Sequence, residues 1–153
     1  MTDITNLSTV NVAISNYIAV VTMNNPPVNA QNRQFHDDLT LAFDVLSDRN
    51  DVRSIVLTGA GKCFSAGADI KGRASQESDL GDHWVHSRRV RECFYSIMEC
   101  RKPVIAAING AALGAGLAVA ASADILIASE SASVGLPCLL YTSPSPRDLL
   151  TSR

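Results

Sequence analysis

The chain has 153 residues, enough for one ordinary domain, and 46% of them are hydrophobic while 18% are charged. This composition excludes a chain that is mostly disordered, and a formal net charge of -2 gives no overall positive field for a nucleic-acid backbone or an anionic membrane surface. We therefore expect neither nucleic acid nor a membrane among its partners.

No segment of the sequence has the pattern of a membrane span or of a secretory signal. The longest apolar stretch, residues 104–121, is interrupted by Asn109 and consists largely of small side chains. The first nine residues lack a basic region followed by an apolar run. The four cysteines have no spacing typical of a disulfide framework, so we expect reduced thiols in a cytoplasmic protein.

The first predicted elements are a hairpin and a helix. Residues 10–14 and 18–23 are β-branched runs that predict two short antiparallel strands. Apolar residues at steps of three and four then predict a helix over residues 31–48 with one face buried.

The remaining elements alternate between strand and helix. A buried strand at residues 54–57 precedes a helix at residues 79–98 that is exposed on one face. Residues 104–108 predict a buried strand, residues 113–121 a helix of small side chains, and residues 125–128 a last strand. This alternation favours an α/β domain in which much of the sheet is parallel.

Two glycine-rich stretches resemble nucleotide-binding loops only superficially. A phosphate loop that ends near Gly61 would require glycine at Val56 and a hydroxyl residue at Cys63. A dinucleotide fingerprint that begins at Gly114 would require a small residue at Val119. Neither stretch therefore predicts a nucleotide site.

The histidines and cysteines of the second predicted helix have simpler explanations than a metal site or a nucleophile. His83 and His86 are three residues apart, but no further zinc ligand lies at a usual spacing, so a solvated polar face explains them better. Cys93 and Cys100 lie at helical spacing and are interpreted as packing residues. We expect no metal.

The same glycine-rich stretches carry a more informative pattern. Residues 59–70 and 109–116 each follow a buried strand, contain small side chains and run toward a helix. Close packing of strand against helix explains such stretches as well as a binding role does. If both reach the same place, two backbone N–H groups can point at one oxygen atom, which is the geometry of an oxyanion hole.

Four motifs in the same order resemble those of the enoyl-CoA hydratase/isomerase family, also called the crotonase family. They are NPPVNA at residues 25–30, SAGADI at residues 65–70, PVIAAINGAALGAG at residues 103–116 and ADI at residues 123–125. Family members are nearly twice as long as this chain. The resemblance implies repeated strand-strand-helix units without their C-terminal half, a coenzyme A thioester as substrate, no separate cofactor, and homotrimers or hexamers of the full-length protein.

The resemblance also implies roles for individual residues. The backbone N–H groups of Ala66 and Ala115 would form the oxyanion hole for the thioester oxygen. The residues expected to contact coenzyme A line one cleft: Val28, Ala30, Ala66, Gly67, Ala68, Asp69 and Ile70.

The acid and base groups depart from the family pattern. Hydratases of the family hold the attacking water with two glutamates, and this chain has Ala118 and Cys138 at the corresponding places. Alanine cannot transfer a proton, which argues against a standard hydratase. We expect an acyl-CoA-binding lyase or isomerase of fatty acid metabolism that stabilises a thioester enolate for hydration, isomerisation, decarboxylation or hydrolysis. A noncatalytic crotonase-like protein that binds acyl-CoA is the alternative.

Residues 138–153 differ from the rest of the chain. They contain two closely spaced prolines and show neither helical nor strand periodicity, which predicts no regular structure. Their first part, CLLYTSPSPRD, resembles the in-frame translation of a transposase-end sequencing adapter. We therefore interpret residues 1–137 as the N-terminal part of a crotonase-like domain and residues 138–153 as a non-native tail. Such a chain is expected to expose apolar surface and to be inactive by itself.

Overall fold

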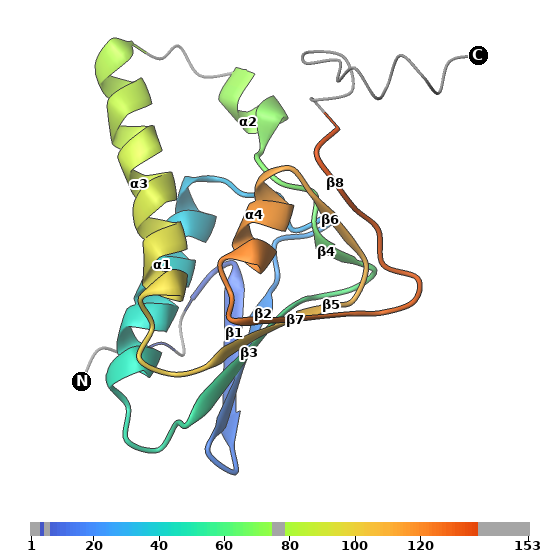
Figure 1. Cartoon of the computed structure of the whole chain (residues 1–153). Helices are drawn as coiled ribbons and strands as arrows, with labels where there is room; N and C mark the ends of the chain where they lie inside the picture. Colours follow the sequence, from blue (N-terminus) through green and yellow to red (C-terminus); the bar gives the residue numbers. More distant parts are fainter. Residues whose placement is uncertain (1–3, 5–6, 75–78, 138–153) are drawn as a thin grey trace, which may run out of the picture.

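The computed structural model describes residues 4, 7–74 and 79–137 (Figure 1). Residues 138–153, for which we expect no regular structure, lie outside the described residues. Within the described part, helices pack against a five-stranded sheet and a smaller three-stranded sheet. This arrangement confirms the predicted α/β class.

The five-stranded sheet contains all the strands that the sequence predicts. In spatial order they are β1 (Val10–Ser15), β2 (Ile18–Met23), β3 (Ser54–Gly59), β5 (Val104–Ile108) and β7 (Ile125–Ala128). β1 and β2 form the predicted antiparallel hairpin, and every later neighbour pairs in parallel. The expectation of a largely parallel sheet is therefore confirmed.

The three-stranded sheet was not predicted. Its parallel strands are β4 (Cys63–Ser65), β6 (Ala111–Leu113) and β8 (Val134–Gly135). Each follows one strand of the large sheet along the chain, so that a long strand, a short strand and then a helix recur as a unit. Strands of two or three residues are too short to show a period in the sequence.

The helices are α1 (Arg33–Asp48), α2 (Ile70–Ala74), α3 (Leu80–Met98) and α4 (Ala115–Ala121). α1 begins two residues later than predicted, because Asn32 is its N-cap and its side-chain oxygen accepts the Phe35 N–H at 2.8 Å. α4 also begins two residues later than predicted, because β6 occupies residues 111–113. α1 and α3 lie side by side on one side of the large sheet (Figure 1).

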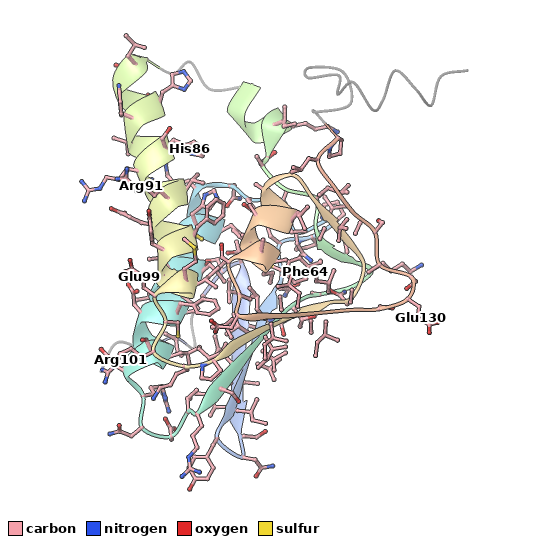
Figure 2. All side chains as sticks on the ribbon, viewed as in Figure 1. Phe64, His86, Arg91, Glu99, Arg101 and Glu130 are labelled. Carbon is pink, nitrogen blue, oxygen red and sulfur yellow. The ribbon has the colours of Figure 1, made fainter. Side chains whose placement is uncertain are left out.

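The hydrophobic core lies between the large sheet and these helices. Phe35 and Phe43 of α1 and Phe64 of β4 are fully buried, and Phe64 lies near the centre of the molecule (Figure 2). Cys93 of α3 is also fully buried, as predicted, and burial raises the pKa of its thiol to about 12. A thiol with such a pKa is not an active nucleophile at neutral pH. Met98, the last residue of α3, is half exposed.

The outer edge of the large sheet is apolar and open in the described part of the chain. β7 ends the strand order, and its residues Ile125, Leu126 and Ile127 are 51%, 49% and 60% exposed. An edge strand with exposed aliphatic side chains is a template for pairing with another chain or segment. This surface agrees with the expectation that apolar residues remain uncovered.

A cluster of charged and titratable side chains joins α1 to α3. Asp37 of α1 forms an ion pair with Arg89 of α3 at 2.6 Å, and the rings of His36 and His86 meet edge to face with centroids 5.9 Å apart. His86 is labelled on α3 in Figure 2. His36 is 2% exposed, and burial together with the charges of His86 and Arg89 lowers its pKa from 6.5 to about 4. His36 is therefore neutral at pH 7.

We expect His36 to make the folded protein sensitive to acid. The unfolded state binds a proton at this residue below about pH 6.5, whereas the folded state does so only near pH 4. The contribution of neutral His36 to the free energy of unfolding is therefore present above pH 6.5. It is lost as the pH is lowered from 6.5 to about 4. The free energy of urea unfolding should be roughly 2 to 3 kcal/mol lower at pH 4.5 than at pH 7 on account of this group.

The measurement compares this pH difference between the wild type and the His36→Phe variant, in which the contribution should disappear. An unchanged difference in His36→Phe would contradict the assignment.

Candidate active site

The loop between β4 and α2 lies directly against the beginning of α4. Gly67 has a φ of +89°, and a Cβ atom at this position would lie 2.6 Å from the Leu113 carbonyl oxygen and 3.1 Å from the Ala115 nitrogen. The two main chains therefore touch where the residue has no side chain. The glycine-rich stretches 59–70 and 109–116 meet, as the oxyanion-hole hypothesis requires.

A third segment, which precedes α1, runs alongside the loop. The Gln31 N–H donates to the Gly67 carbonyl at 2.8 Å, and the Asp69 N–H donates to the Gln31 carbonyl at 3.1 Å. These bonds bring Val28 and Ala30 next to the residues that follow β4. The structure thus brings together the residues that the sequence analysis assigned to a coenzyme A cleft.

The N–H of Ala66 is already used within the protein. It donates to the Val28 carbonyl at 3.0 Å. The prediction that this amide contributes to an oxyanion hole does not fit the geometry, because a donor held by an internal acceptor is not available to a substrate. Ala66 remains exposed at the loop surface, where it is one of the residues assigned to the cleft.

Ala68 provides the available amide instead. Gln31 pairs with Ala68 as an isolated parallel bridge, and the bonds of this bridge use the Gly67 carbonyl and the Asp69 N–H. Since successive backbone groups of an extended segment point in opposite directions, the Ala68 N–H points away from Gln31. Among the backbone hydrogen bonds of the described residues, none is donated by Ala68.

Ala115 presents a second available amide. It is the first residue of α4, and the preceding Gly114 is the N-cap with a φ of +54°. The first N–H groups of a helix have no acceptor within the helix. In the described part of the chain no backbone hydrogen bond is donated by Ala115, whereas the Ala118 N–H donates to Gly114. The predicted role of Ala115 is therefore compatible with the structure.

Asn29 holds the loops together, although its residue type alone had predicted no role for it. Its side-chain nitrogen donates to the carbonyls of Ala60, Cys63 and Phe64 at 3.1, 2.8 and 3.2 Å. Its side-chain oxygen accepts the Asn25 N–H at 3.0 Å. Asn29 is 2% exposed and has a φ of +51°. Its position in the NPPVNA motif is the sequence feature that could have indicated this structural role.

Asp69 and Ile70, the last two residues predicted to line the cleft, differ in their contacts within the protein. The Asp69 carboxylate accepts the Gly72 N–H at 2.9 Å, which caps the beginning of α2. Ile70, the first residue of α2, is 77% exposed. The polar residue thus stabilises the local fold, while the apolar one is available for contact with a ligand.

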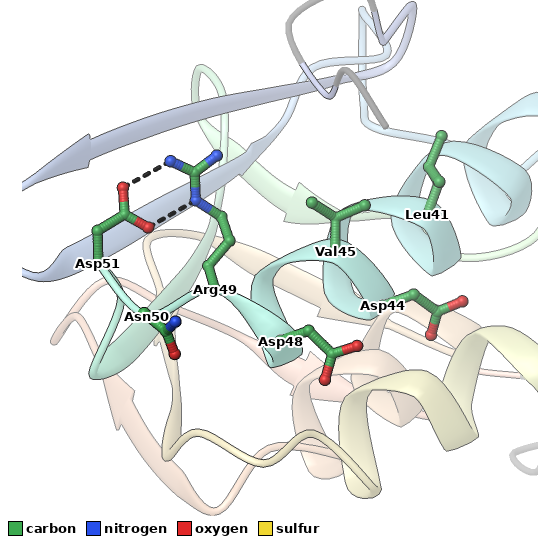
Figure 3. Close-up of a pocket in the computed structure, with 7 residues that line it drawn as sticks. All are labelled: Leu41, Asp44, Val45, Asp48, Arg49, Asn50 and Asp51. Atoms are coloured by element: carbon green, nitrogen blue, oxygen red, sulfur yellow. Dashed lines mark hydrogen bonds and ion pairs between the residues drawn. The ribbon is translucent and has the colours of Figure 1, made fainter. Parts of the chain in front are cut away.

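A separate hollow lies on the outer face of α1, near its C-terminal end (Figure 3). It is lined by Leu41, Asp44, Val45, Asp48, Arg49, Asn50 and Asp51. Arg49 is paired with Asp51, and burial together with the charge of Asp48 raises the pKa of Asp44. Such an acidic lining repels the phosphate groups of coenzyme A, so this hollow is not a candidate for that ligand.

Two further features are absent from the described residues. No helix there is both long enough and apolar enough to cross a membrane. No group of three or more His, Cys, Asp or Glu side chains in the described residues is placed to hold a metal ion.

Comparison with known proteins connects this geometry to a family. A family model described as enoyl-CoA hydratase/isomerase matches residues 13–145. The chain belongs to the enoyl-CoA hydratase/isomerase family. The crotonase resemblance of the four sequence motifs is thereby confirmed.

Curated relatives of the chain include more than one named activity. A probable enoyl-CoA hydratase of Bacillus subtilis is 39% identical over 131 residues, which cover 86% of this chain and 50% of the relative. A Mycobacterium tuberculosis protein named (7aS)-7a-methyl-1,5-dioxo-2,3,5,6,7,7a-hexahydro-1H-indene-carboxyl-CoA hydrolase is 37% identical over 121 residues, which cover 78% and 48%. The chain spans about half the length of the curated relatives it matches.

Solved structures show the same fold. Pseudomonas aeruginosa DspI is similar with a TM-score of 0.80 and 33% identity, over 94% of this chain and 58% of that one. An enoyl-CoA hydratase/carnithine racemase of Magnetospirillum magneticum has a TM-score of 0.83 and 28% identity, over 95% and 55%. The α/β fold of repeated strand-strand-helix units in this chain is therefore the crotonase fold, and the chain covers 58% and 55% of these two structures.

We expect two substitutions at Asn29 to separate its hydrogen bonds from its backbone conformation. Asn29→Gly removes the side-chain bonds but tolerates the positive φ, and should lower the free energy of unfolding by about 2 to 3 kcal/mol. Asn29→Ala should cost about 1 kcal/mol more, because alanine disfavours this conformation. Urea unfolding measures both values. Wild-type stability in the glycine variant would show that the three carbonyl bonds contribute nothing.

Proposed function

We propose that the full-length protein binds an acyl-CoA thioester and stabilises its enolate with the backbone N–H groups of Ala68 and Ala115. The observation that carries this proposal is the contact at Gly67, which places the segments bearing these two available amides against each other. Membership of the hydratase/isomerase family supports the class of substrate.

The proposed site acts on the charge that develops at the thioester oxygen. Removal of the proton next to the thioester carbonyl moves a pair of electrons toward that oxygen, which becomes an enolate oxygen. Two fixed N–H donors stabilise this charge without having to reorient during the reaction. Ala118, the half-buried alanine of α4, cannot accept the proton. We therefore assign the base to a part of the full-length protein that lies beyond residue 137.

The other properties of the full-length protein are proposed with the same substrate in mind. Coenzyme A arrives as part of the substrate, so the reaction as proposed uses no separate cofactor and no metal. We also propose that the protein is cytoplasmic and assembles as a homotrimer or hexamer. The present chain, with β7 uncovered in its described part, is expected to be inactive alone.

We predict that Ala115→Pro in the full-length enzyme abolishes most turnover of its acyl-CoA substrate. Proline is favoured at the first position of a helix, so α4 should still form while the amide donor is lost. Loss of one such donor costs on the order of 10² to 10³ in kcat. The measurement is the rate of exchange of the protons next to the thioester carbonyl in D₂O, followed by NMR.

Ala115→Ser is the matched control, because it keeps the amide and should keep exchange near the wild-type rate. Circular dichroism and binding of free coenzyme A verify that the proline variant is folded. Wild-type exchange in folded Ala115→Pro would rule out this amide as an oxyanion donor.

We also predict that the full-length enzyme hydrates crotonyl-CoA slowly, because Ala118 replaces one of the two glutamates of the resembled hydratases. A missing acid or base group lowers a rate by roughly 10² to 10⁴. The loss of absorbance of the conjugated thioester measures hydration. Ala118→Glu should accelerate it, and a rate already equal to that of two-glutamate hydratases would show that another residue does this work.

The relative named as a CoA hydrolase supports chemistry other than hydration. The second candidate function is a noncatalytic crotonase-like protein that binds acyl-CoA. Binding of acyl-CoA without any exchange of the protons next to the carbonyl would favour this candidate over the enzyme.

A further inference from the structure

Gln31 and Ser65 form a buried polar pair beneath the loop that carries Ala68. They are 1% and 0% exposed, and the Gln31 side-chain nitrogen donates to the Ser65 hydroxyl at 3.3 Å. The backbone of Gln31 forms the bridge with Ala68. Gln31 therefore holds the loop twice, once through its main chain and once through its side chain.

The Ser65 hydroxyl uses all of its hydrogen-bonding capacity inside this network. It donates to the Asn29 carbonyl at 2.7 Å and accepts the Gly67 N–H at 3.2 Å in addition to the Gln31 amide. A hydroxyl has one donor and two acceptor positions, so all three are occupied. The Gly67 N–H belongs to the peptide between residues 66 and 67, which directly precedes the peptide that carries the Ala68 N–H. The hydrogen bond to Ser65 thereby restricts the direction of that preceding peptide.

Ser65 also contacts the segment that carries the second amide. A Cβ atom at Gly116, the second residue of α4, would collide with the Ser65 carbonyl and would lie 2.9 Å from its Cβ. Ser65 is therefore packed between the Gly67 peptide on one side and the first turn of α4 on the other. A shift of Ser65 would alter the spacing of the Ala68 and Ala115 amides.

The side-chain oxygen of Gln31 is buried and has no hydrogen-bond partner among the described residues. A buried polar atom without a partner costs free energy that an apolar side chain of the same shape would not. Glutamine is thus an unfavourable choice for this position unless the donation from its nitrogen to Ser65 has a use. The useful part of the side chain is its N–H group.

We propose that Gln31, acting through the Ser65 hydroxyl, is a positioning residue that aims the Ala68 N–H at the thioester oxygen. This inference rests on the proposed function and adds to it the residue that aligns one donor. Gln31 contacts no substrate. Gln31 affects the alignment of the oxyanion hole, and thereby the polarisation of the bound carbonyl and the rate of enolate formation. It does not affect the affinity for coenzyme A.

The test uses the full-length enzyme and the variant Gln31→Met. Methionine has nearly the same shape, removes the donor to Ser65, and also removes the unpartnered oxygen, so the melting temperature should stay equal or rise. The probe is cinnamoyl-CoA, whose absorption moves to longer wavelength when its thioester carbonyl accepts stronger hydrogen bonds. The shift on binding should be smaller in the variant, and exchange of the protons next to the carbonyl of butyryl-CoA should be about 10- to 100-fold slower. The dissociation constant of free coenzyme A should change by less than about twofold.

Gln34→Met is the matched control, because Gln34 lies on the exposed side of α1 and donates to Asp38. It should leave the absorption shift and the exchange rate unchanged. Ser65→Ala removes the intermediate hydroxyl and should reduce the absorption shift as Gln31→Met does.

Two results are decisive in different ways. If the wild type binds cinnamoyl-CoA without any absorption shift, the proposed oxyanion hole itself is refuted. If the wild type shows the shift and Gln31→Met shows the same shift and exchange rate, the hole stands and the positioning role of Gln31 is refuted. Equal losses of stability, coenzyme A binding and absorption shift in Gln31→Met would likewise refute it in favour of a purely structural role.

Discussion

The close approach of two main-chain segments, residues 59–67 and 110–116, is the constraint on which the rest of the structure depends. At Gly67, Gly110 and Gly116 a Cβ atom would collide with the backbone of the opposite segment. The three short strands β4, β6 and β8 can therefore form a sheet of their own at the end of the large sheet. The first turn of α4 and the loop after β4 are fixed to each other by steric contact.

Three of the buried polar side chains of the described residues lie at the same place. Asn29, Gln31 and Ser65 are almost fully buried, while most of the core between the helices and the large sheet is apolar. A satisfied buried polar group specifies one geometry more sharply than apolar packing does, and the Ser65 hydroxyl is fully satisfied although the Gln31 side-chain oxygen has no partner among the described residues. The side chains of this network thus restrict the directions of backbone groups in the loop, such as the Gly67 N–H.

Much of the large sheet could be predicted from the sequence, because β-branched runs such as residues 18–23 and 104–108 signal strands directly. The helices α1 and α3 were also predictable from their spacing of apolar residues. The short strands were not, since they are held by pairing between distant segments. The glycine-rich motifs indicated the candidate site, but in a regular extended segment the amides of Ala66 and Ala68 would point the same way, and the positive φ of Gly67 between them breaks this regularity. The choice between Ala66 and Ala68 therefore depends on the bridge to Gln31, a contact across 37 residues that local pattern cannot reveal.

The spatial order of the large sheet is the same as the order of its strands along the chain. β2, β3, β5 and β7 each add to the outer side of the strand that precedes them in the sheet. During synthesis on a ribosome, every new parallel strand therefore emerges when its partner is already present. The growing sheet need not be opened to admit a later strand. The crossovers between strands are long, but assembly can proceed in one direction at the pace of translation.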